Sequence, residues 1–419
     1  MNTRIKAIAA LATAAATALT VTACGSSDSA GGGGGGDTLV IGVDLPFTGS
    51  SQTASDSTWD AMNQYLDSID GKAGDYTIKL KKYDDATAAA GKWDEAQCAA
   101  NADDHLANLD EIAVMGTYNS GCAAIEIPAI NGGEDPLFMV SHANTAVGLT
   151  KKWDTGEPDK YYPSGVRTYA RVVTTDDYQG KAGAQFAIQD QGVTNCLVLD
   201  DTEVYGKGVA STFAAEAKAE GIKYSTQAWD GKATNYNALF SKAKADGVDC
   251  VYFGGVFDNN GAQLIKDKVS ILGDNSTVKL FAPDGWTGYT DTLDTMPEAE
   301  GMFTTFPGLP LSDIAKTEKG GAFLTAYKEA HGGADPANSY AIYGVQALQV
   351  ILAAIEASDG TRAGVLDAFH DGITISADDA ILGKEIAIDG ETGDVNAVDM
   401  TVQKTTGGAE TTFKGWPVS

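Results

Sequence analysis

Residues 112–145, IAVMGTYNSGCAAIEIPAINGGEDPLFMVSHANT, contain the pattern that decides the fold of this chain. Two short apolar runs, Ile112–Met115 and Leu137–Val140, flank a segment of helical character at Cys122–Ile130. Each apolar run ends in a small polar turn, the first in GTYNSG and the second in SHANT. We therefore predict two neighbouring parallel strands joined by a helix. Because ligands of open α/β sheets bind at the carboxyl ends of strands, these turns should form one wall of a ligand site.

Strands and helices alternate along the rest of the chain. An apolar strand at Thr38–Val43 precedes a helix at Ser57–Ile69, a strand at Tyr76–Tyr83 and a helix at Ala88–Leu106. The same alternation restarts near Thr175 and continues for about a hundred residues. Such a pattern predicts mostly parallel sheets covered by helices. The expected fold class is α/β, with two doubly wound, Rossmann-like lobes.

Two extended segments, 168–175 and 301–307, fall between the two series of elements. We interpret them as crossings between the lobes, because a chain that leaves one sheet, builds a second and returns forms a two-lobed clamp with a hinge. The expected boundaries are a signal peptide at 1–23, a tether at 24–36, a first lobe of 37–173 with 308–392, and a second lobe of 174–307 with 393–419.

The composition sets limits on location and partners. The chain has 419 residues, more than one ordinary hydrophobic core accommodates, and this length argues for two lobes. Its formal net charge is -28. Nucleic-acid binding needs a basic footprint, so this acidity excludes a nucleic-acid partner. The charge is typical of a soluble body outside the cytoplasm.

The N-terminus has the layout of an export signal. Arg4 and Lys6 precede an apolar run at Ala7–Val21, which ends in LTVTAC, a bacterial lipobox. We expect Cys24 to be lipidated, although an ordinary small-residue cleavage site is the alternative. The glycine run at Gly31–Gly36 would act as a flexible tether, and as a coil Gly25–Gly36 would span roughly 20 Å on average. The expected location is the extracytoplasmic face of the cell membrane, held by a lipid anchor.

Four further cysteines suggest disulfides in an exported chain, and four cysteines allow three pairings. We favour Cys98–Cys122, which would join two successive helices, and Cys196–Cys250, which open two strands that could lie side by side. Each closed loop would contribute about 3–4 kcal/mol. A metal site is the competing interpretation. We expect none, because the chain has no C-x-x-C and its histidines are scattered.

No motif of an enzyme or of a cofactor site is complete. Gly116 and Gly121 have part of a phosphate-loop spacing, but the residues that follow are not Lys and Ser/Thr. A Cys122/His142 or Ser120/His142 hydrolase is conceivable, yet no third orienting residue stands at a known spacing. We therefore predict no catalytic residue, no cofactor and no enzymatic activity.

An ordered set of short segments resembles one protein family. These segments are IGVDLPFTG, YNSG, SHANT, the turn at Tyr205-Gly206, FGGVFDNNG and APDGW. From Thr38 onward the chain resembles the solute-binding lipoproteins of ABC importers with the type I periplasmic fold, in the branched-chain amino-acid (leucine/isoleucine/valine) receptor group. The resemblance implies two lobes joined by a three-strand hinge.

The resemblance also implies a set of residues that bind the head group of an amino acid. Ser120 would bind the carboxylate through its hydroxyl and N–H. The backbone carbonyl of Asn144 would accept from the ammonium, and the hydroxyl of Thr145 would join the same cluster. From the second lobe, Tyr205 would close onto the head group and Asp284 would pair with the ammonium. These residue types suit the chemistry, since a carboxylate needs donors and an ammonium needs acceptors.

The pocket for the rest of the ligand matches the family less well. The loop at 50–55, SSQTAS, has no aromatic ring where the family often has one. Tyr118 and Trp286 flank the head-group residues and are expected pocket residues. Phe257, Tyr340 and Tyr343 are further candidates, although aromatic residues at such spacings are more often core.

The expected function is capture of a small amino acid, branched-chain or related, between the two lobes and its delivery to an ABC importer. The implied partners are the permease and ATPase subunits in the membrane. The same fold could instead bind an amide, urea or an aromatic acid, or serve as a sensor subunit.

Overall fold

The computed structural model describes residues 38–290, 292–293 and 295–417. The predicted signal peptide, the lipidated Cys24 and the glycine tether lie outside these residues. Within the described residues, no helix is long and apolar enough to cross a membrane.

The first lobe is built on a six-stranded sheet in the order β2-β3-β1-β6-β7-β8. Its strands are parallel except for β2, which pairs antiparallel with β3. The bounds are β1 Thr38–Leu45, β2 Lys72–Ala73, β3 Tyr76–Asp84, β6 Glu111–Gly116, β7 Phe138–Ser141 and β8 Tyr169–Arg171.

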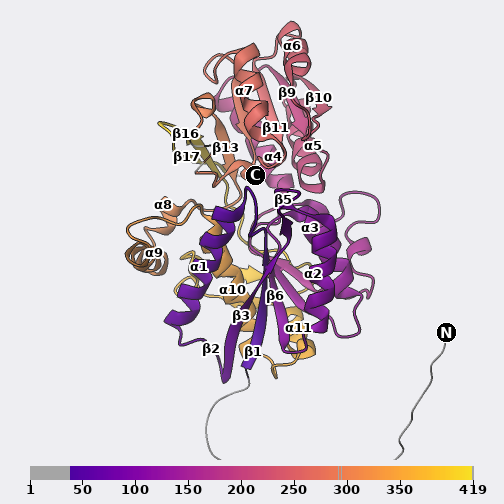
Figure 1. Ribbon diagram of the computed structural model, residues 1–419, viewed down its shortest axis with the longest axis vertical. Coiled ribbons are helices and arrows are strands. Elements are labelled where there is room, and N and C mark those ends of the chain that lie inside the picture. The colour runs from indigo at the N-terminus through magenta and orange to yellow at the C-terminus, as the bar shows by residue number, and fades with distance from the viewer. Residues whose placement is uncertain (1–37, 291, 294, 418–419) are drawn as a thin grey trace, which may run out of the picture. The chain divides into compact units, whose positions relative to one another are not determined.

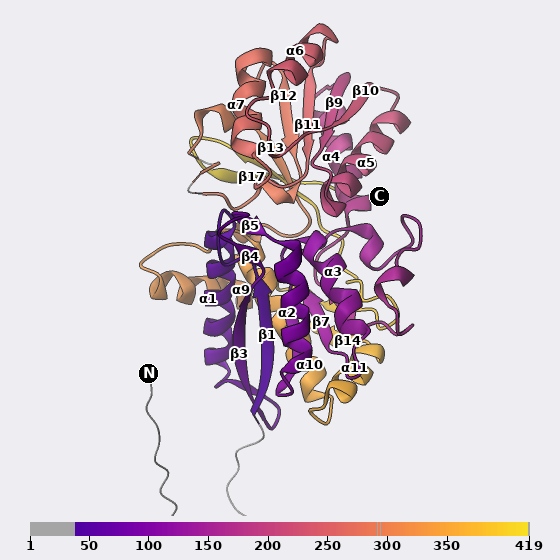
Figure 2. The same cartoon turned by 45° about the vertical axis from the view of Figure 1, so that its right-hand side comes forward.

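Helices cover both faces of this sheet (Figure 2). On one face, α1 packs on α10, and the apolar side chains of α10 form much of the core with those of β1. On the other face, α2 packs on α3, and side chains of α3 contact those of β6 and β7. The bounds are α1 Gln52–Ser68, α2 Glu95–Ala107, α3 Ser120–Asn131, α8 Leu311–Ile314, α9 Glu318–Ala330, α10 Tyr340–Glu356 and α11 Arg362–His370.

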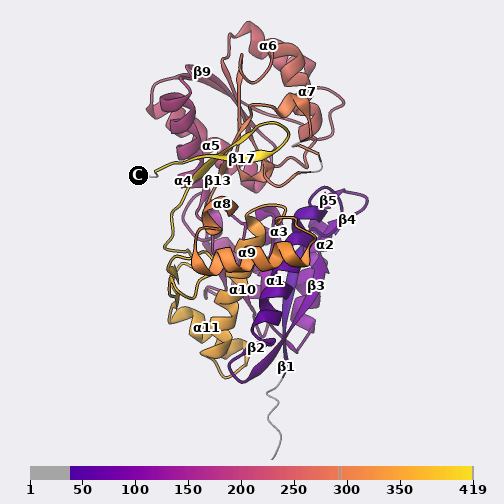
Figure 3. The ribbon, with the colours of Figure 1, turned by 90° about the vertical axis from the view of Figure 1, so that its left-hand side faces the viewer.

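The second lobe is built on a seven-stranded sheet in the order β10-β9-β11-β12-β13-β16-β17. The first five strands are parallel, while β16 and β17 are antiparallel additions at the edge (Figure 3). The strand bounds are β9 Asn195–Asp200, β10 Lys223–Ala228, β11 Cys250–Gly254, β12 Lys279–Ala282, β13 Phe303–Phe306, β16 Thr401–Thr405 and β17 Glu410–Gly415. The helix bounds are α4 Asp176–Gln185, continued by a π-helical turn at Phe186–Asp190, α5 Val204–Ala219, α6 Asn237–Ala245 and α7 Gly261–Leu272.

The chain passes between the two sheets three times (Figure 1). The crossings follow β8, β13 and the short strand β15, Ile386–Ile388, which pairs with β14, Ile373–Ile375. This is the expected α/β fold of two doubly wound lobes with a three-strand hinge. The exact lobe boundaries stay a prediction. Gly393 is assigned to the second lobe, but its carbonyl oxygen accepts from the N–H of Arg171 on the first-lobe sheet at 3.0 Å.

Two predicted helices were wrong at their start. The helix expected from Ser57 begins earlier, at Gln52. The helix expected from Ala88 begins at Glu95, and a hairpin of β4 Ala86–Thr87 and β5 Lys92–Trp93 precedes it. The carboxylate of Asp94 accepts from the N–H groups of Ala96 at 3.0 Å and Gln97 at 3.2 Å. This N-cap fixes the helix start, because it satisfies amides that have no partner inside the helix.

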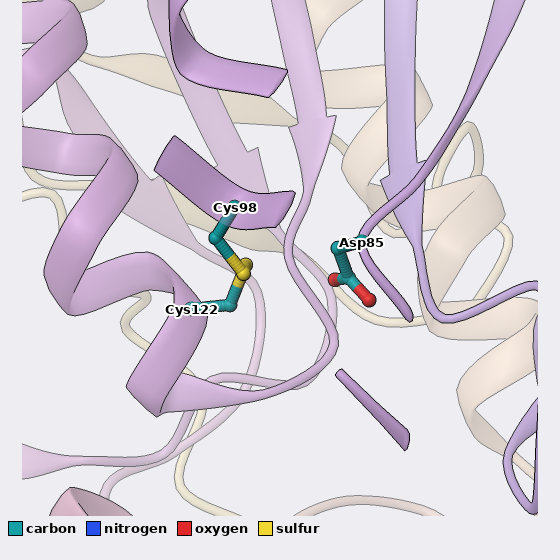
Figure 4. A group of neighbouring side chains, drawn as sticks. All are labelled: Asp85, Cys98 and Cys122. Carbon is teal, nitrogen blue, oxygen red and sulfur yellow. A yellow bond between two sulfur atoms is a disulfide. The ribbon is translucent and has the colours of Figure 1, made fainter. Parts of the chain in front are cut away.

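The two disulfides join Cys98 to Cys122 and Cys196 to Cys250, the pairing that the sequence favours. The first links α2 to the opening turn of α3, and the second links β9 to β11 at directly paired positions. The buried carboxylate of Asp85 lies beside the first disulfide (Figure 4). Because both sulfurs are bonded to each other, this group cannot act as a thiolate metal site.

Candidate ligand-binding site

A small pocket lies between the lobes, next to the two turns that open the sequence analysis. Its cavity volume is about 20 Å3, room for one or two water molecules. Both lobes contribute to its lining, which comprises Tyr118, Asn119, Ser120, Gly121, Ala143, Glu203, Tyr205, Val256, Asp284, Gly285 and Tyr340. The structure therefore brings together four of the seven predicted binding residues: Tyr118, Ser120, Tyr205 and Asp284.

Asp284 is the polar centre of this pocket. It follows β12 in a short 3-10 turn and is buried. The hydroxyl of Tyr205, on the first turn of α5, donates to Oδ1 at 2.7 Å. The hydroxyl of Tyr340, on the first turn of α10, donates to Oδ2 at 2.6 Å. One carboxylate of the second lobe is thus held by a hydroxyl from each lobe.

Close packing at this turn requires glycine after Asp284. A Cβ at Gly285 would lie 2.8 Å from the carbonyl oxygen of Gly255 and 2.9 Å from Cε1 of Tyr205. The Gly285 N–H also donates to the Tyr205 hydroxyl at 2.9 Å. The sequence PDG therefore fixes the relative positions of the acid and the tyrosine.

The ionisable side chains that line the pocket are acidic. Its described lining contains no Lys, Arg or His, and its acids are Asp284 and Glu203. Glu203 pairs with Lys92 of β5, whereas Asp284 has neutral partners, the two tyrosine hydroxyls and the side chain of Gln179. Burial raises the pKa of Asp284 above its ordinary value, and the two tyrosine hydroxyls oppose that rise. A cation placed against Asp284 would complete the charge balance of the site.

The first-lobe wall of the pocket is the N-terminus of α3. Ser120 is the first residue of this helix, and its hydroxyl accepts from the N–H of Ala146 at 3.4 Å. The amides of the first helical turn have no partner within the helix, and they carry the positive end of the helix dipole. This wall can accept an anionic group such as a carboxylate.

Asn144 lies behind the pocket rather than in its lining. Its side-chain amide donates to the carbonyl oxygens of Thr117 at 2.9 Å and Tyr118 at 3.0 Å. The carbonyl oxygen expected to accept from an ammonium accepts from Nη1 of Arg171 at 3.1 Å. In this arrangement Asn144 holds the turn that carries Tyr118 and Ser120.

Thr145 also lies outside the lining. Its carbonyl accepts from the N–H of Asp176 at 2.9 Å, and its hydroxyl lies beside the buried carboxyl of the same residue. Burial and the charge of Asp284 raise the pKa of Asp176 well above its ordinary value. Asp176 thus adds a second acid behind Asp284.

Trp286 belongs to the core of the second lobe. Its ring packs against Phe253 at 5.0 Å and Phe257 at 5.6 Å between centroids, and the side chain is fully buried. It is not among the residues that line the pocket. By contrast, Tyr118 does line it, with its ring 5.6 Å from that of Tyr340.

Two pocket residues carried weak signals in the sequence. Tyr340 opens an apolar helix and was considered only as a candidate more typical of core. Glu203 was not singled out, because nothing in the sequence shows that Lys92, 111 residues earlier, pairs with it. An acid just before a helix that follows a strand is a signal that could have indicated Glu203, whereas α10 follows the helix α9 and gives Tyr340 no such signal.

Neither conceivable hydrolase pair is assembled. Cys122 is bonded to Cys98, so it offers no thiolate. The ring nitrogens of His142 have no hydrogen-bond partner in the described structure, so His142 makes no hydrogen bond to Ser120. Burial lowers the pKa of His142 to about 3, so the ring stays neutral between Tyr118 and Tyr340.

Contacts between the lobes surround the pocket. Lys92 of the first lobe donates to Glu203 and, at 2.6 Å, to Oδ1 of Asn259. Ser51, which precedes α1, donates to Oδ2 of Asp258 at 2.9 Å. Together with the Tyr340–Asp284 bond, these contacts describe a closed arrangement of the two lobes.

Comparisons with known proteins agree with this architecture. The model of the family described as "Periplasmic binding protein" matches residues 38–409. A Leu/Ile/Val-binding protein of Rhizobium johnstonii is 27% identical over 380 residues, covering 87% of this chain and 91% of the relative. An amino-acid-binding protein of Pseudomonas aeruginosa is 26% identical over 327 residues, covering 75% of this chain and 78% of the relative.

Solved structures share the fold. A leucine-binding protein of Thermotoga maritima superposes with a TM-score of 0.74 at 20% identity, covering 90% of this chain and 98% of its own. A solute-binding protein of an ABC transporter of Rhodopseudomonas palustris, in complex with p-hydroxybenzoic acid, has a TM-score of 0.71 at 17% identity and covers 91% of this chain and 98% of its own. Since the family model spans most of the chain, this protein belongs to the periplasmic binding protein family, whose members bind solutes.

Proposed function

We propose that this protein captures an amino acid between its two lobes, outside the cytoplasm, and delivers it to the permease and ATPase subunits of an ABC importer. One observation carries the proposal. Asp284 is buried at the pocket, its hydrogen-bond partners are neutral side chains, and the described lining has no cationic side chain. An α-ammonium group would supply the missing positive charge.

The two ends of an amino acid fit opposite walls of the pocket. The carboxylate would face the N-terminus of α3, where Ser120 offers a hydroxyl and an N–H. The ammonium would face Asp284. In this arrangement Asn144 would act from behind the lining by holding the turn that carries Tyr118 and Ser120. Thr145 would act from there by holding Asp176. Trp286 would act through its packing in the core of the second lobe.

Ligand entry requires the lobes to separate. A cavity of about 20 Å3 is much smaller than an amino acid. The ligand would first bind one lobe of an open form, and the contacts of Tyr340 and Lys92 with the second lobe would then favour closure.

Relatives of this fold also bind aromatic acids, so the ligand class needs a direct test. Isothermal titration calorimetry of the residues 38–419 protein against amino acids, simple amides, urea and 4-hydroxybenzoate would provide it. We expect 1:1 binding of at least one amino acid and weaker binding of compounds without an α-ammonium. Tight binding of 4-hydroxybenzoate or an amide, with no response to amino acids, would contradict the proposal.

We also propose that the protein is a lipoprotein anchored through Cys24 after removal of residues 1–23. The support is the LTVTAC segment and the glycine run that follows it. In cells that express the full chain, replacement of Cys24 by Ser should move the exported protein from the membrane fraction to the soluble fraction. An unchanged membrane fraction would show that Cys24 is not the anchor.

A further inference from the structure

Two acids stand in the described lining of the ligand pocket, and they differ in their partners. Asp284 has neutral partners, whereas Glu203 accepts from Nζ of Lys92. Oε2 of Glu203 also accepts from Nε1 of Trp93 at 3.2 Å, and its Oε1 accepts from Nδ2 of Asn259 at 2.9 Å. The charge of Glu203 is thus balanced by a cation of the protein itself.

Glu203 lies next to the wall that is proposed to bind the carboxylate. It shares the lining of the small pocket with Ser120 and Gly121, the first two residues of α3. The side chain of Trp93 reaches both places. Its Nε1 donates to Glu203, and a Cβ added at Gly121 would lie 2.5 Å from Cζ2 of the same ring. A carboxylate bound at Ser120 would therefore lie close to the charge of Glu203.

Two negative charges at such close quarters repel each other, because a partly buried site screens them less than water does. The N-terminal end of α3 favours a carboxylate, whereas an unpaired Glu203 would disfavour it. The ammonium of Lys92 removes this repulsion by pairing with Glu203. The side chains of the pair are 25% and 16% exposed, so solvent weakens their attraction only in part.

Lys92 lies on the far side of Glu203 from the ligand pocket. It is not in the described lining of that pocket. Instead, Lys92, Glu203 and Asn259 line a second cavity, of about 610 Å3, between the β4–β5 hairpin and the second lobe. Any effect of Lys92 on a ligand must therefore pass through Glu203, which makes Lys92 a positioning residue.

We propose that Lys92 allows the pocket to accept a ligand carboxylate, by neutralising Glu203 when the lobes close. The proposal rests on the proposed function, since it assumes that the carboxylate faces Ser120 and the α-ammonium faces Asp284. Lys92 belongs to the first lobe and Glu203 to the second, so the neutralisation exists only while the lobes are together. The closed pocket then presents one uncompensated acid, Asp284, to one ammonium, and this selects a zwitterion over a purely cationic ligand.

Amino acids and their α-carboxamides test this proposal, because the two compounds differ mainly in the charge of the carboxyl group. The probes are alanine, leucine and phenylalanine, each paired with alaninamide, leucinamide or phenylalaninamide. In isothermal titration calorimetry we expect the unmodified protein to bind at least one of these amino acids about tenfold or more tightly than its amide. In Lys92→Met this preference should fall to about threefold or less.

Three further variants separate the charge of Lys92 from its contact with the second lobe. Glu203→Gln removes the charge that Lys92 neutralises, so the preference for the amino acid should persist there, and adding Lys92→Met should no longer lower it. Lys92→Arg keeps the positive charge and should keep most of the preference. Lys242→Met removes an equal charge from an exposed pair with Asp246 at the end of α6 and should change neither affinity. Circular dichroism melting curves check that each variant folds.

The possible failures are distinct. Equal losses for the amino acid and its amide in Lys92→Met would show that Lys92 only fastens the lobes together. An equally large loss of preference when Lys92→Met is added to Glu203→Gln would show that Lys92 does not act through Glu203. Either result, or amides that bind the unmodified protein as tightly as amino acids, would overturn this inference and leave the amino-acid function intact. Absence of any amino-acid binding would refute the proposed function, and this inference with it.

Discussion

Two of the regions that hold buried carboxylates differ in what neutralises their charge. In the first lobe, His105 of α2 lies between Asp44 and Glu111, with Nε2 3.0 Å from Oδ2 of Asp44 and Nδ1 bonded to Glu111. All three side chains are fully buried. In the pocket, Asp284 has two tyrosine hydroxyls and no cation among its partners.

In the first-lobe cluster, His105 supplies the positive charge that neutralises the carboxylates. Although burial lowers the pKa of His105, the hydrogen bonds and charges of Asp44 and Glu111 raise it to about 9. The remaining carboxylate oxygens accept from Asn101 at 3.1 Å and from Tyr83 at 2.8 Å. Such an internally neutralised cluster stabilises the fold. The pocket lacks the internal cation, so a ligand can supply it.

Removing the internal cation should produce the largest effect. In His105→Gln, two buried carboxylates lose their positive partner, and we expect the free energy of unfolding to fall by about 3–5 kcal/mol. Ligand affinity should change by less than about threefold, because the cluster does not line the pocket. Urea denaturation and calorimetry measure the two quantities.

A matched control for that variant is His331→Gln. His331 is partly exposed at the end of α9 and stacks on Tyr327, so its loss should cost about 1 kcal/mol or less. If His105→Gln cost no more than this control, the cluster would not be an internal ion pair.

Stability should depend on pH in a direction set by the same cluster. His105 has a pKa of about 9 in the folded protein against about 6.5 in the unfolded chain. Its contribution is fully present below pH 6.5 and is lost as the pH rises through 9, for a total on the order of 3 kcal/mol. Burial also raises the pKa of Asp85 and Glu126, which adds a loss in the same direction.

Urea denaturation between pH 6 and pH 9.5 measures this dependence. The free energy of unfolding should fall over that range in the unmodified protein and fall less in His105→Gln. A rise in stability across the range would contradict the charge assignment of the cluster.

Removing one neutral partner of Asp284 should have a smaller effect, confined to binding. Tyr340→Phe deletes a hydroxyl that links the lobes, and we expect affinity to fall roughly three- to tenfold, or about 1 kcal/mol. Tyr343→Phe makes an identical change on α10, where the hydroxyl accepts from the N–H of Leu309 instead. Equal losses of affinity in both variants would show that Tyr340 acts through packing and not through Asp284.

The sequence predicted the two-lobed fold because alternating strands and helices carry a strong local pattern. The resemblance to the solute-binding family, carried by short segments at strand ends, also indicated Tyr118, Ser120, Tyr205 and Asp284, which the structure brings into one pocket. The head-group roles of these residues remain predictions.

Other features depend on contacts between distant segments. The pairs Lys92–Glu203 and Ser51–Asp258 join residues 111 and 207 positions apart, and no local pattern indicates them. Tyr340 begins an apolar helix and resembles a core residue until its hydroxyl is located. The hairpin before α2 was missed because two-residue strands carry too little periodicity.

The central claim is that Asp284 accepts from the α-ammonium of the ligand. A thermodynamic cycle of four titrations tests this claim. The unmodified protein and Asp284→Asn are each titrated with the amino acid that binds most tightly. Each is then titrated with the analogue of that amino acid that lacks the α-amino group. We predict that the mutation weakens amino-acid binding by about 2–4 kcal/mol but scarcely affects the analogue, giving a coupling energy of about 2 kcal/mol or more. Equal losses for both ligands, with a coupling energy near zero, would contradict the claim.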